Sequence, residues 1–141
     1  MSRFLVSAQM LLIALIAFPF HTAQLNMFNL GLFALGLMVG VAAITAMPAR
    51  SFSVMPEPTS ECELVTRGIY RHIRHPMYLA VLLCGLAACL AYASAFKWGL
   101  LALLAGVLMA KIRREERLLL ARFEGYAAYR LRTKALIPYL I

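Results

Sequence analysis

Four long apolar runs constrain the fold of this chain more than any other feature. They extend from Phe4 to Phe20, Leu30 to Met47, Met77 to Phe96 and Trp98 to Ala110, and none contains an acidic or basic residue. A helix rises about 1.5 Å per residue, so such runs cross most of a bilayer core of roughly 30 Å. With 63% hydrophobic and 14% charged residues in 141, the chain is predicted to be a single-domain, all-α integral membrane protein with four transmembrane helices.

The first run has a competing interpretation as a signal peptide that begins at Arg3. It lacks a convincing small-residue cleavage site, and the second run follows after a short link. We therefore expect a retained transmembrane helix. In the second run, Gly31, Gly36 and Gly40 are spaced for close helix approach.

The basic residues gather at one side of the predicted bundle. The net charge of +8 could suggest nucleic acid, but it is concentrated in the segments between and after the apolar runs, as in membrane proteins. Of the fourteen lysines and arginines, only Lys97 falls on the far side, where Tyr92 and Trp98 also mark a turn. The positive-inside rule then places both termini in the cytoplasm.

The long polar connection, Pro48 to His75, is predicted to be a cytoplasmic loop, and loops of this length are usually functional or disordered. Its last part carries five basic or titratable side chains before Pro76, which suits the first turn of the next helix. They are Arg67, Arg71, His72, Arg74 and His75. Such a cluster can anchor a helix to lipid headgroups or form half of a binding site.

A helical hairpin supplies the other half. The third helix leaves the cytoplasmic face at Pro76 and the fourth returns to it near Lys111, so Arg74 to Tyr78 should lie beside Lys111 to Glu116. From Ile112 onward the pattern predicts a C-terminal amphipathic helix whose apolar stripe includes Ile112, Leu119, Phe123 and Tyr126. Glu115 and Glu116 lie on or beside that stripe, and carboxylates there are costly unless paired.

A plain structural interpretation explains the same residues. Lys111 with Glu115 and Arg113 with Glu116 are spaced for ion pairs along a solvated helix face. Two histidines without a third ligand exclude a zinc site, and the three cysteines form no disulfide framework. The spacing of these charged residues is compatible both with an ion-paired, solvent-exposed helix face and with a binding site.

A larger pattern resembles the isoprenylcysteine carboxyl methyltransferase family, whose relatives act on phospholipid amines. It comprises Leu64, Val65, Thr66, Gly68 and Tyr70, then Arg74, His75, Pro76 and Tyr78, and later Glu115 and Glu116. The tail with Leu119, Phe123, Tyr126, Tyr129, Ile137 and Pro138 is also similar to that family. Residues 1–47 would be two scaffold helices and residues 48–138 the cofactor-binding core.

The resemblance implies S-adenosylmethionine-dependent methyl transfer at the cytoplasmic membrane face. The acceptor would be lipid-like, either the carboxylate of a prenylcysteine-like thioether acid or a phospholipid amine. The positions that match the family's cofactor site are Cys62, Glu63, Leu64, Val65, Gly68, Tyr70, His75, Pro76, Met77, Tyr78 and Glu115. Those assigned to catalysis are Arg74, Lys111 and Glu116, with Glu116 or His75 as the base for an amine acceptor.

The chain departs from the family at several positions. Lys111 stands where the family has a substrate-contacting arginine, and lysine loses the bidentate grip on a carboxylate. Ala80 stands in place of a glycine and Ile69 in place of a proline.

Other functions are compatible with parts of the pattern. An NADPH-dependent reductase of the sterol reductase type shares the Arg-His-Pro-x-Tyr motif, but usually has asparagine where this chain has Met77. A small transporter of cations needs an acidic residue inside a span, and the first three spans have none. A non-catalytic membrane protein that kept the motif is the third alternative.

Overall fold

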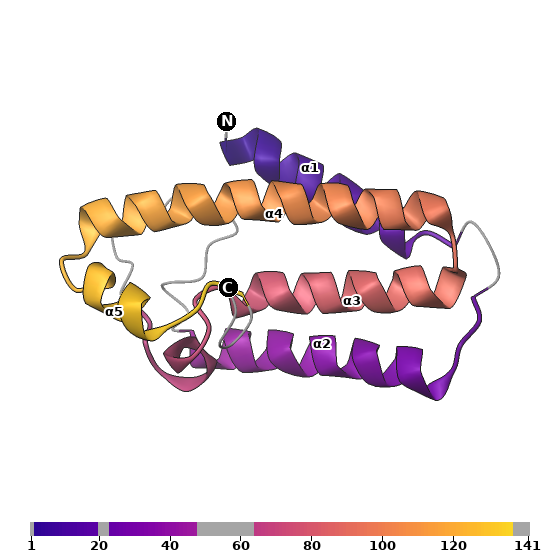
Figure 1. Ribbon diagram of the computed structural model, residues 1–141, viewed down its shortest axis with the longest axis horizontal. Coiled ribbons are helices and arrows are strands. Elements are labelled where there is room, and N and C mark those ends of the chain that lie inside the picture. The colour runs from indigo at the N-terminus through magenta and orange to yellow at the C-terminus, as the bar shows by residue number, and fades with distance from the viewer. Residues whose placement is uncertain (1, 20–22, 48–63, 137–141) are drawn as a thin grey trace.

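The computed structural model describes residues 2–19, 23–47 and 64–136, and these residues form α-helices, one 3₁₀ helix and no β-strand (Figure 1). The elements in chain order are α1 (Ser2–Ala17), α2 (Met27–Ala46), η2 (Gly68–Arg71), α3 (Pro76–Tyr92), α4 (Ala95–Arg122) and α5 (Tyr126–Arg132). The prediction of an all-α chain is thus confirmed for these residues. The loop from residue 48 to 63 lies outside them.

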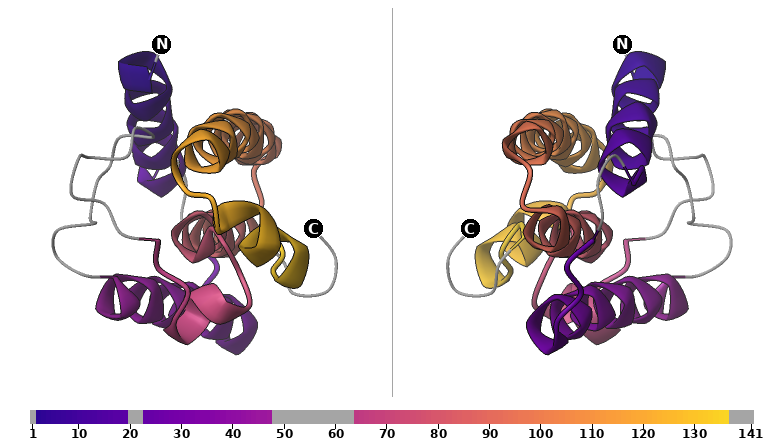
Figure 2. Two further views of the ribbon diagram at one scale, coloured as in Figure 1. Left: turned by 90° about the vertical axis from the view of Figure 1, so that its left-hand side faces the viewer. Right: turned by 90° about the vertical axis from the view of Figure 1, so that its right-hand side faces the viewer.

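Helix α3 is central. It packs against α2 on one side and against α4 and α1 on the other, and the two end views in Figure 2 show these layers. Helices α3 and α4 run antiparallel, so the beginning of α3 and the end of α4 share one end of the molecule with η2 and α5 (Figure 1). The predicted hairpin is therefore present.

Among the described residues, two helices, α2 and α4, are long and apolar enough to cross a membrane. The other two apolar helices, α1 and α3, have 16 and 17 residues. Helix α1 ends at Ala17 rather than at Phe20 because Pro19 disfavours helical geometry in the residue before it. The four-span arrangement stays a prediction for α1 and α3.

The turn between α3 and α4 lies earlier than the apolar runs predicted. Ala93 adopts a left-handed conformation with a φ of 46°, and its N–H bonds to the Cys89 carbonyl, which ends α3. Ser94 then precedes α4, so Ala95 and Phe96 belong to the fourth helix and not to the third. Apolar content alone cannot place such a turn, because both helices are equally apolar there.

Lys97 lies just after the α3–α4 turn, as expected, and its side chain is fully buried. Its Nζ donates to the carbonyl oxygens of Ile16 and Phe18, at 2.5 and 2.8 Å, and lies 3.6 Å from the centre of the Tyr92 ring. The carbonyls at the end of a helix lack intrahelical partners, and a lysine can satisfy them. Lys97 thus joins the end of α1 to the α3–α4 turn.

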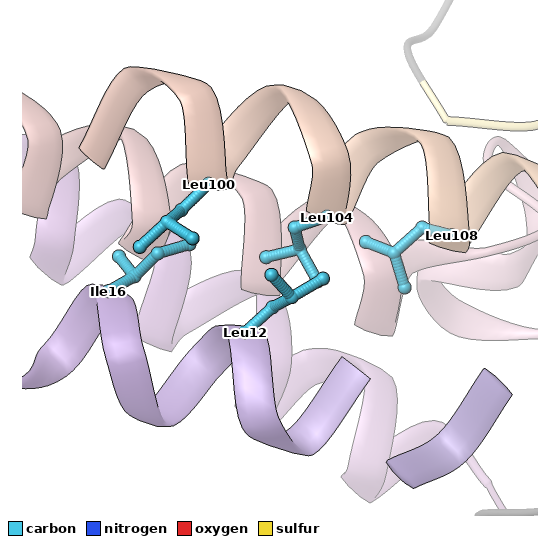
Figure 3. Packing of buried hydrophobic residues seen from close by; sticks show 5 residues of the cluster. All are labelled: Leu12, Ile16, Leu100, Leu104 and Leu108. Atoms are coloured by element: carbon cyan, nitrogen blue, oxygen red, sulfur yellow. The ribbon is translucent and has the colours of Figure 1, made fainter. Parts of the chain in front are cut away.

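The contact between α1 and α4 is a row of large aliphatic side chains. Leu12 and Ile16 of α1 face Leu100, Leu104 and Leu108 of α4, and all five are buried (Figure 3). Residues four apart fall on one face of a helix, so each set forms a ridge. This packing fixes α1 along α4.

The contact between α2 and α3 is close because Gly36 has no side chain. A Cβ atom at Gly36 would lie 2.7 Å from the Cys84 Sγ and 3.2 Å from the Ala80 carbonyl oxygen. A Cβ at Gly40 would make an ordinary contact, 3.5 Å from the Ala80 Cβ. A Cβ at Gly31 would have no neighbour within 4 Å, so the predicted role of Gly31 in close helix approach is wrong.

The expected C-terminal amphipathic helix is interrupted. Phe123 is extended and ends α4, and after a turn at Gly125 the chain resumes as the short helix α5. Ile112 and Tyr126 of the predicted stripe are both buried, but they belong to different helices. Glycine lowers helix propensity, and the turn lets α5 fold back toward η2 and α3 (Figure 2).

We predict that Gly36→Ala destabilises the protein by about 1–3 kcal/mol, because the added methyl group meets backbone atoms of α3. Thermal unfolding in detergent measures the effect. Gly31→Ala on the same helix is the matched control and should unfold at or above the wild-type temperature. Equal unfolding temperatures for the two variants would contradict this account of the α2–α3 contact.

Candidate functional site

The segment before α3 is held in place by the chain that follows α5. Residues Ile73 and Lys134 form a parallel bridge, in which the Arg74 N–H donates to the Lys134 carbonyl at 2.8 Å. The His75 N–H donates to the Ala135 carbonyl at 2.9 Å. Pro76 occupies the first turn of α3, as predicted, where its missing N–H leaves no hydrogen bond unmade. We call Arg74, His75 and Pro76 the Arg-His-Pro corner, and backbone hydrogen bonds to Lys134 and Ala135 hold it in place.

Arg74 pairs with Glu116 of α4. Its Nε lies 2.7 Å from Glu116 Oε1, and the two side chains are only 9% and 11% exposed. The Arg74 Nη1 donates to the carbonyls of Arg130 and Thr133. Arg130 lies 3.4 Å from the other Glu116 oxygen. Glu116 thus lies between two guanidinium groups, an arrangement that favours an ionised carboxylate.

Glu115 joins His75 and Tyr78 in a second set of contacts. The His75 Nδ1 lies 3.3 Å from Glu115 Oε2, and the Tyr78 hydroxyl donates to Glu115 Oε1. The His75 and Tyr78 rings are stacked, with centroids 5.6 Å apart and planes inclined by 7°. We name Arg74, His75, Tyr78, Glu115 and Glu116 the corner cluster. The predicted proximity of the two ends of the hairpin is confirmed.

The corner cluster changes the titration of His75. Burial disfavours the imidazolium, but the interactions with Glu115 and Glu116 outweigh burial and raise the pKa of His75 above its ordinary value. Nearby Tyr70 is buried, and this burial, with smaller contributions from Tyr129 and Glu115, raises its pKa to about 12. The phenol of Tyr70 therefore stays neutral at physiological pH.

Lys111 does not pair with Glu115 along the helix as its spacing suggested. The ammonium is buried, donates to the Gln9 Oε1 of α1 at 2.7 Å and lies 5.1 Å from the centre of the Tyr78 ring. The side chain of a buried lysine needs such an acceptor, and α1 supplies it. Sequence reasoning treated α1 as scaffold and missed Gln9, although an amide within an apolar run was a usable signal.

The other predicted cofactor positions are spread around the corner. Leu64, Val65 and Met77 are half-buried, and Tyr70 accepts a hydrogen bond at its carbonyl from the Tyr129 hydroxyl. Gly68 has a φ of 59° and lies against Ala46 at the end of α2, a backbone conformation that favours glycine. Cys62 and Glu63, and Ile137 and Pro138 of the tail, lie outside the described residues.

Two buried polar atoms near the corner lack a hydrogen-bond partner in the part of the chain that the structure describes. They are the His75 Nε2 and the Tyr126 hydroxyl. The His75 Nε2 lies 3.6 Å from Glu116 Oε1, close enough for an ionic attraction once the ring is protonated. Buried polar groups are rarely left unpaired, so a partner for these two atoms is expected beyond the described side chains.

The arrangement offers acidic, basic and aromatic groups in one buried place. Two carboxylates suit an ammonium or sulfonium group, arginine suits a carboxylate, and the His75–Tyr78 stack has faces suited to a planar ring. Tyr129, Arg130 and Thr133 add contacts that the sequence motif did not assign.

The comparison with known families agrees with the motif. Residues 25–125 match the family model of the phospholipid methyltransferases. No curated protein matches the chain. The match covers more than half of the chain and includes the whole corner cluster, and it starts after α1 and ends before α5. The chain therefore belongs to the phospholipid methyltransferase family.

Proposed function

We propose that this protein transfers a methyl group from S-adenosylmethionine to a lipid-like acceptor at the cytoplasmic face of a membrane. Family membership implies a methyltransferase, and the apolar helices fit a membrane setting. The observation that carries the proposal is the corner cluster, in which Glu115 and Glu116 lie against Arg74, His75 and Tyr78.

The residues present fit the cofactor by their chemistry. S-Adenosylmethionine carries a sulfonium, an ammonium and a carboxylate around an adenine ring, and when bound it supplies an electrophilic methyl group. Glu115 is the side chain we assign to its positive groups, and Tyr78 and His75 offer aromatic surface. The unpartnered His75 Nε2 supports this assignment. Leu64, Val65, Gly68, Tyr70, Pro76 and Met77, with Cys62 and Glu63, complete the proposed cofactor set.

The chain's own residues would act by positioning and by excluding water. Methyl transfer is an in-line displacement, helped chiefly by alignment of the reacting groups in a dry site. The Arg74–Glu116 pair fixes the start of α3 against α4 and so sets the distance between the two halves of the site. Lys111, held by Gln9, places a positive charge beside the Tyr78 ring, where we assign it to the acceptor.

His75 is the side chain we assign as base if the acceptor is an amine. Its Nδ1 faces Glu115, so in the neutral ring the proton belongs on Nδ1 and the lone pair on Nε2. A proton taken up at Nε2 would be stabilised by Glu116 at 3.6 Å. A carboxylate acceptor, as in isoprenylcysteine-type methylation, needs no base. Glu116 itself is engaged by Arg74 and Arg130, which weakens it as a base.

We predict that Glu115→Gln and His75→Ala each weaken S-adenosylhomocysteine binding by about tenfold to a hundredfold, because each removes a contact involving a charged group. Calorimetry of the purified protein in detergent measures the affinity. Glu124→Gln and His72→Ala change exposed residues near the site and serve as matched controls. Wild-type affinity in both test variants would show that the site assignment is wrong.

We also predict that stability falls as the pH rises above about 6.5. The pKa of His75 in the folded protein is higher than its ordinary value of 6.5. The folded protein therefore binds the His75 proton more tightly than the unfolded chain does. The stabilising contribution is complete below the unfolded pKa and is lost as the pH passes through the folded pKa.

Thermal unfolding measured from pH 6 to pH 9 tests this expectation. His75→Gln should flatten the decline over the range above pH 6.5, whereas His72→Gln, an exposed histidine three residues earlier, should keep it. An unchanged decline in His75→Gln would mean that another group titrates.

A further inference from the structure

The hydrogen bond between Gln9 of α1 and Lys111 of α4 extends the row of side chains that packs these two helices together. Leu12 and Leu104 lie side by side in that row (Figure 3). Gln9 precedes Leu12 by three residues and Lys111 follows Leu104 by seven, so both lie on the packed helix faces. Because α1 and α4 run antiparallel (Figure 1), the register of the aliphatic row brings the two polar side chains together.

Gln9 orients the Lys111 ammonium toward α1. The Lys111 Nζ lies 2.7 Å from the Gln9 Oε1, and the two residues are only 1% and 6% exposed. An ammonium group can only donate hydrogen bonds, so the amide of Gln9 must present its oxygen. The same Nζ lies 5.1 Å from the centre of the Tyr78 ring. A buried positive charge is thus held between α1 and α3 by a neutral acceptor.

Glu115 is the other acceptor that the sequence offers to Lys111. It follows Lys111 by one helical turn, a spacing at which lysine and glutamate side chains can pair. Among the described residues, however, Glu115 contacts the His75 Nδ1 at 3.3 Å and accepts a hydrogen bond from the Tyr78 hydroxyl. A carboxylate binds an ammonium more strongly than an amide does. The bond to Gln9 therefore keeps Lys111 from competing for Glu115.

We propose that Gln9 is a positioning residue: by holding the Lys111 ammonium toward α1, it keeps Glu115 available to the rest of the corner cluster and to the cofactor. The part that concerns the cofactor rests on the proposed function. Gln9 precedes residues 25–125, so the family match gives it no role. Without the Gln9 oxygen, the buried ammonium needs another acceptor, and Glu115 is spaced to supply it.

Binding of S-adenosylhomocysteine to the purified protein in detergent, measured by calorimetry, tests this positioning role. Gln9→Leu removes the acceptor but keeps a side chain of similar size, and it should weaken binding about tenfold because Lys111 then pairs with Glu115. Adding Lys111→Met removes the competing charge and should return the affinity to within about twofold of the wild type. A merely structural role for Gln9 predicts no such recovery.

Two further variants of Gln9 test the requirement for its oxygen. Gln9→Glu keeps an acceptor within reach of Lys111 and should bind the nucleoside as the wild type does. Gln9→Asn is one methylene shorter and should weaken binding about threefold. This smaller loss should also disappear when Lys111→Met is added, which keeps the test decisive if Gln9→Leu does not fold.

The matched controls are Gln24→Leu and Ile16→Ala. Gln24 is an exposed glutamine outside α1, and Ile16 belongs to the aliphatic row two turns from Gln9. Ile16→Ala should lower the unfolding temperature, and both variants should keep the wild-type affinity for the nucleoside. An equal loss of affinity in Ile16→Ala, or no recovery when Lys111→Met is added to the Gln9 variants, would overturn the proposal.

The titration of His75, followed by NMR of the labelled imidazole, gives a second readout that needs no cofactor. The groups around the imidazole are Glu115 and Glu116 of α4, the stacked Tyr78 ring of α3, and Arg74 through its pair with Glu116. The Gln9→Leu variant leaves all of these in place. It changes only how strongly Glu115 is engaged by another cation.

In Gln9→Leu, a Glu115 carboxylate shared with Lys111 attracts the imidazolium less. The pKa of His75 should therefore fall below its wild-type value, and it should return to that value or rise above it when Lys111→Met is added. A pKa of His75 that does not change in Gln9→Leu would contradict the positioning role.

The two readouts separate this inference from the proposed function. If the wild type fails to bind the nucleoside while His75 responds to Gln9→Leu as expected, the proposed methyl transfer fails and the positioning role of Gln9 stands. If the wild type binds the nucleoside and neither readout responds to Gln9→Leu, the positioning role fails and the proposed function is unaffected.

Discussion

The ion pair between Arg74 and Glu116 is the constraint on which the functional end of this molecule depends. Both side chains are about nine-tenths buried, and an unpaired charge at such a depth is strongly destabilising. The pair can form only if the start of α3 lies beside the later turns of α4. Arg74 also bonds to carbonyls around α5, so the same guanidinium determines where the chain after α4 returns.

Apolar packing brings these charges together but does not by itself orient them. The ridge of leucines on α4 holds α1, and Gly36 lets α2 approach α3 closely, which leaves α3 enclosed between layers. Dispersion and hydrophobic burial are non-directional, so several rotations of α4 would bury a similar area. The bonds of Glu115 and Glu116 to the Arg-His-Pro corner select one of them.

Helix α1 and the segment after α4 lie largely outside the family match, yet both contribute to the site. Gln9 satisfies the buried ammonium of Lys111, and Lys97 donates to the Ile16 carbonyl in the last turn of α1. Lys134 and Ala135 pair with the backbone of the corner. The part of the chain that the family model matches is therefore held in place by elements on both sides of the match.

The amino-acid sequence by itself determined the helical class, the hairpin and the meeting of Arg74 and His75 with the two glutamates, because apolar length and charge position are local properties of a chain. It could not determine the turn at Ala93, the break at Phe123 or the partners of Lys97 and Lys111. These features depend on which hydrogen-bond acceptors and packing surfaces distant segments place nearby. For example, the Gln9 that accepts a hydrogen bond from Lys111 is 102 positions away. Only the tertiary structure decides them, since a buried polar group takes whichever partner the packed helices bring within reach.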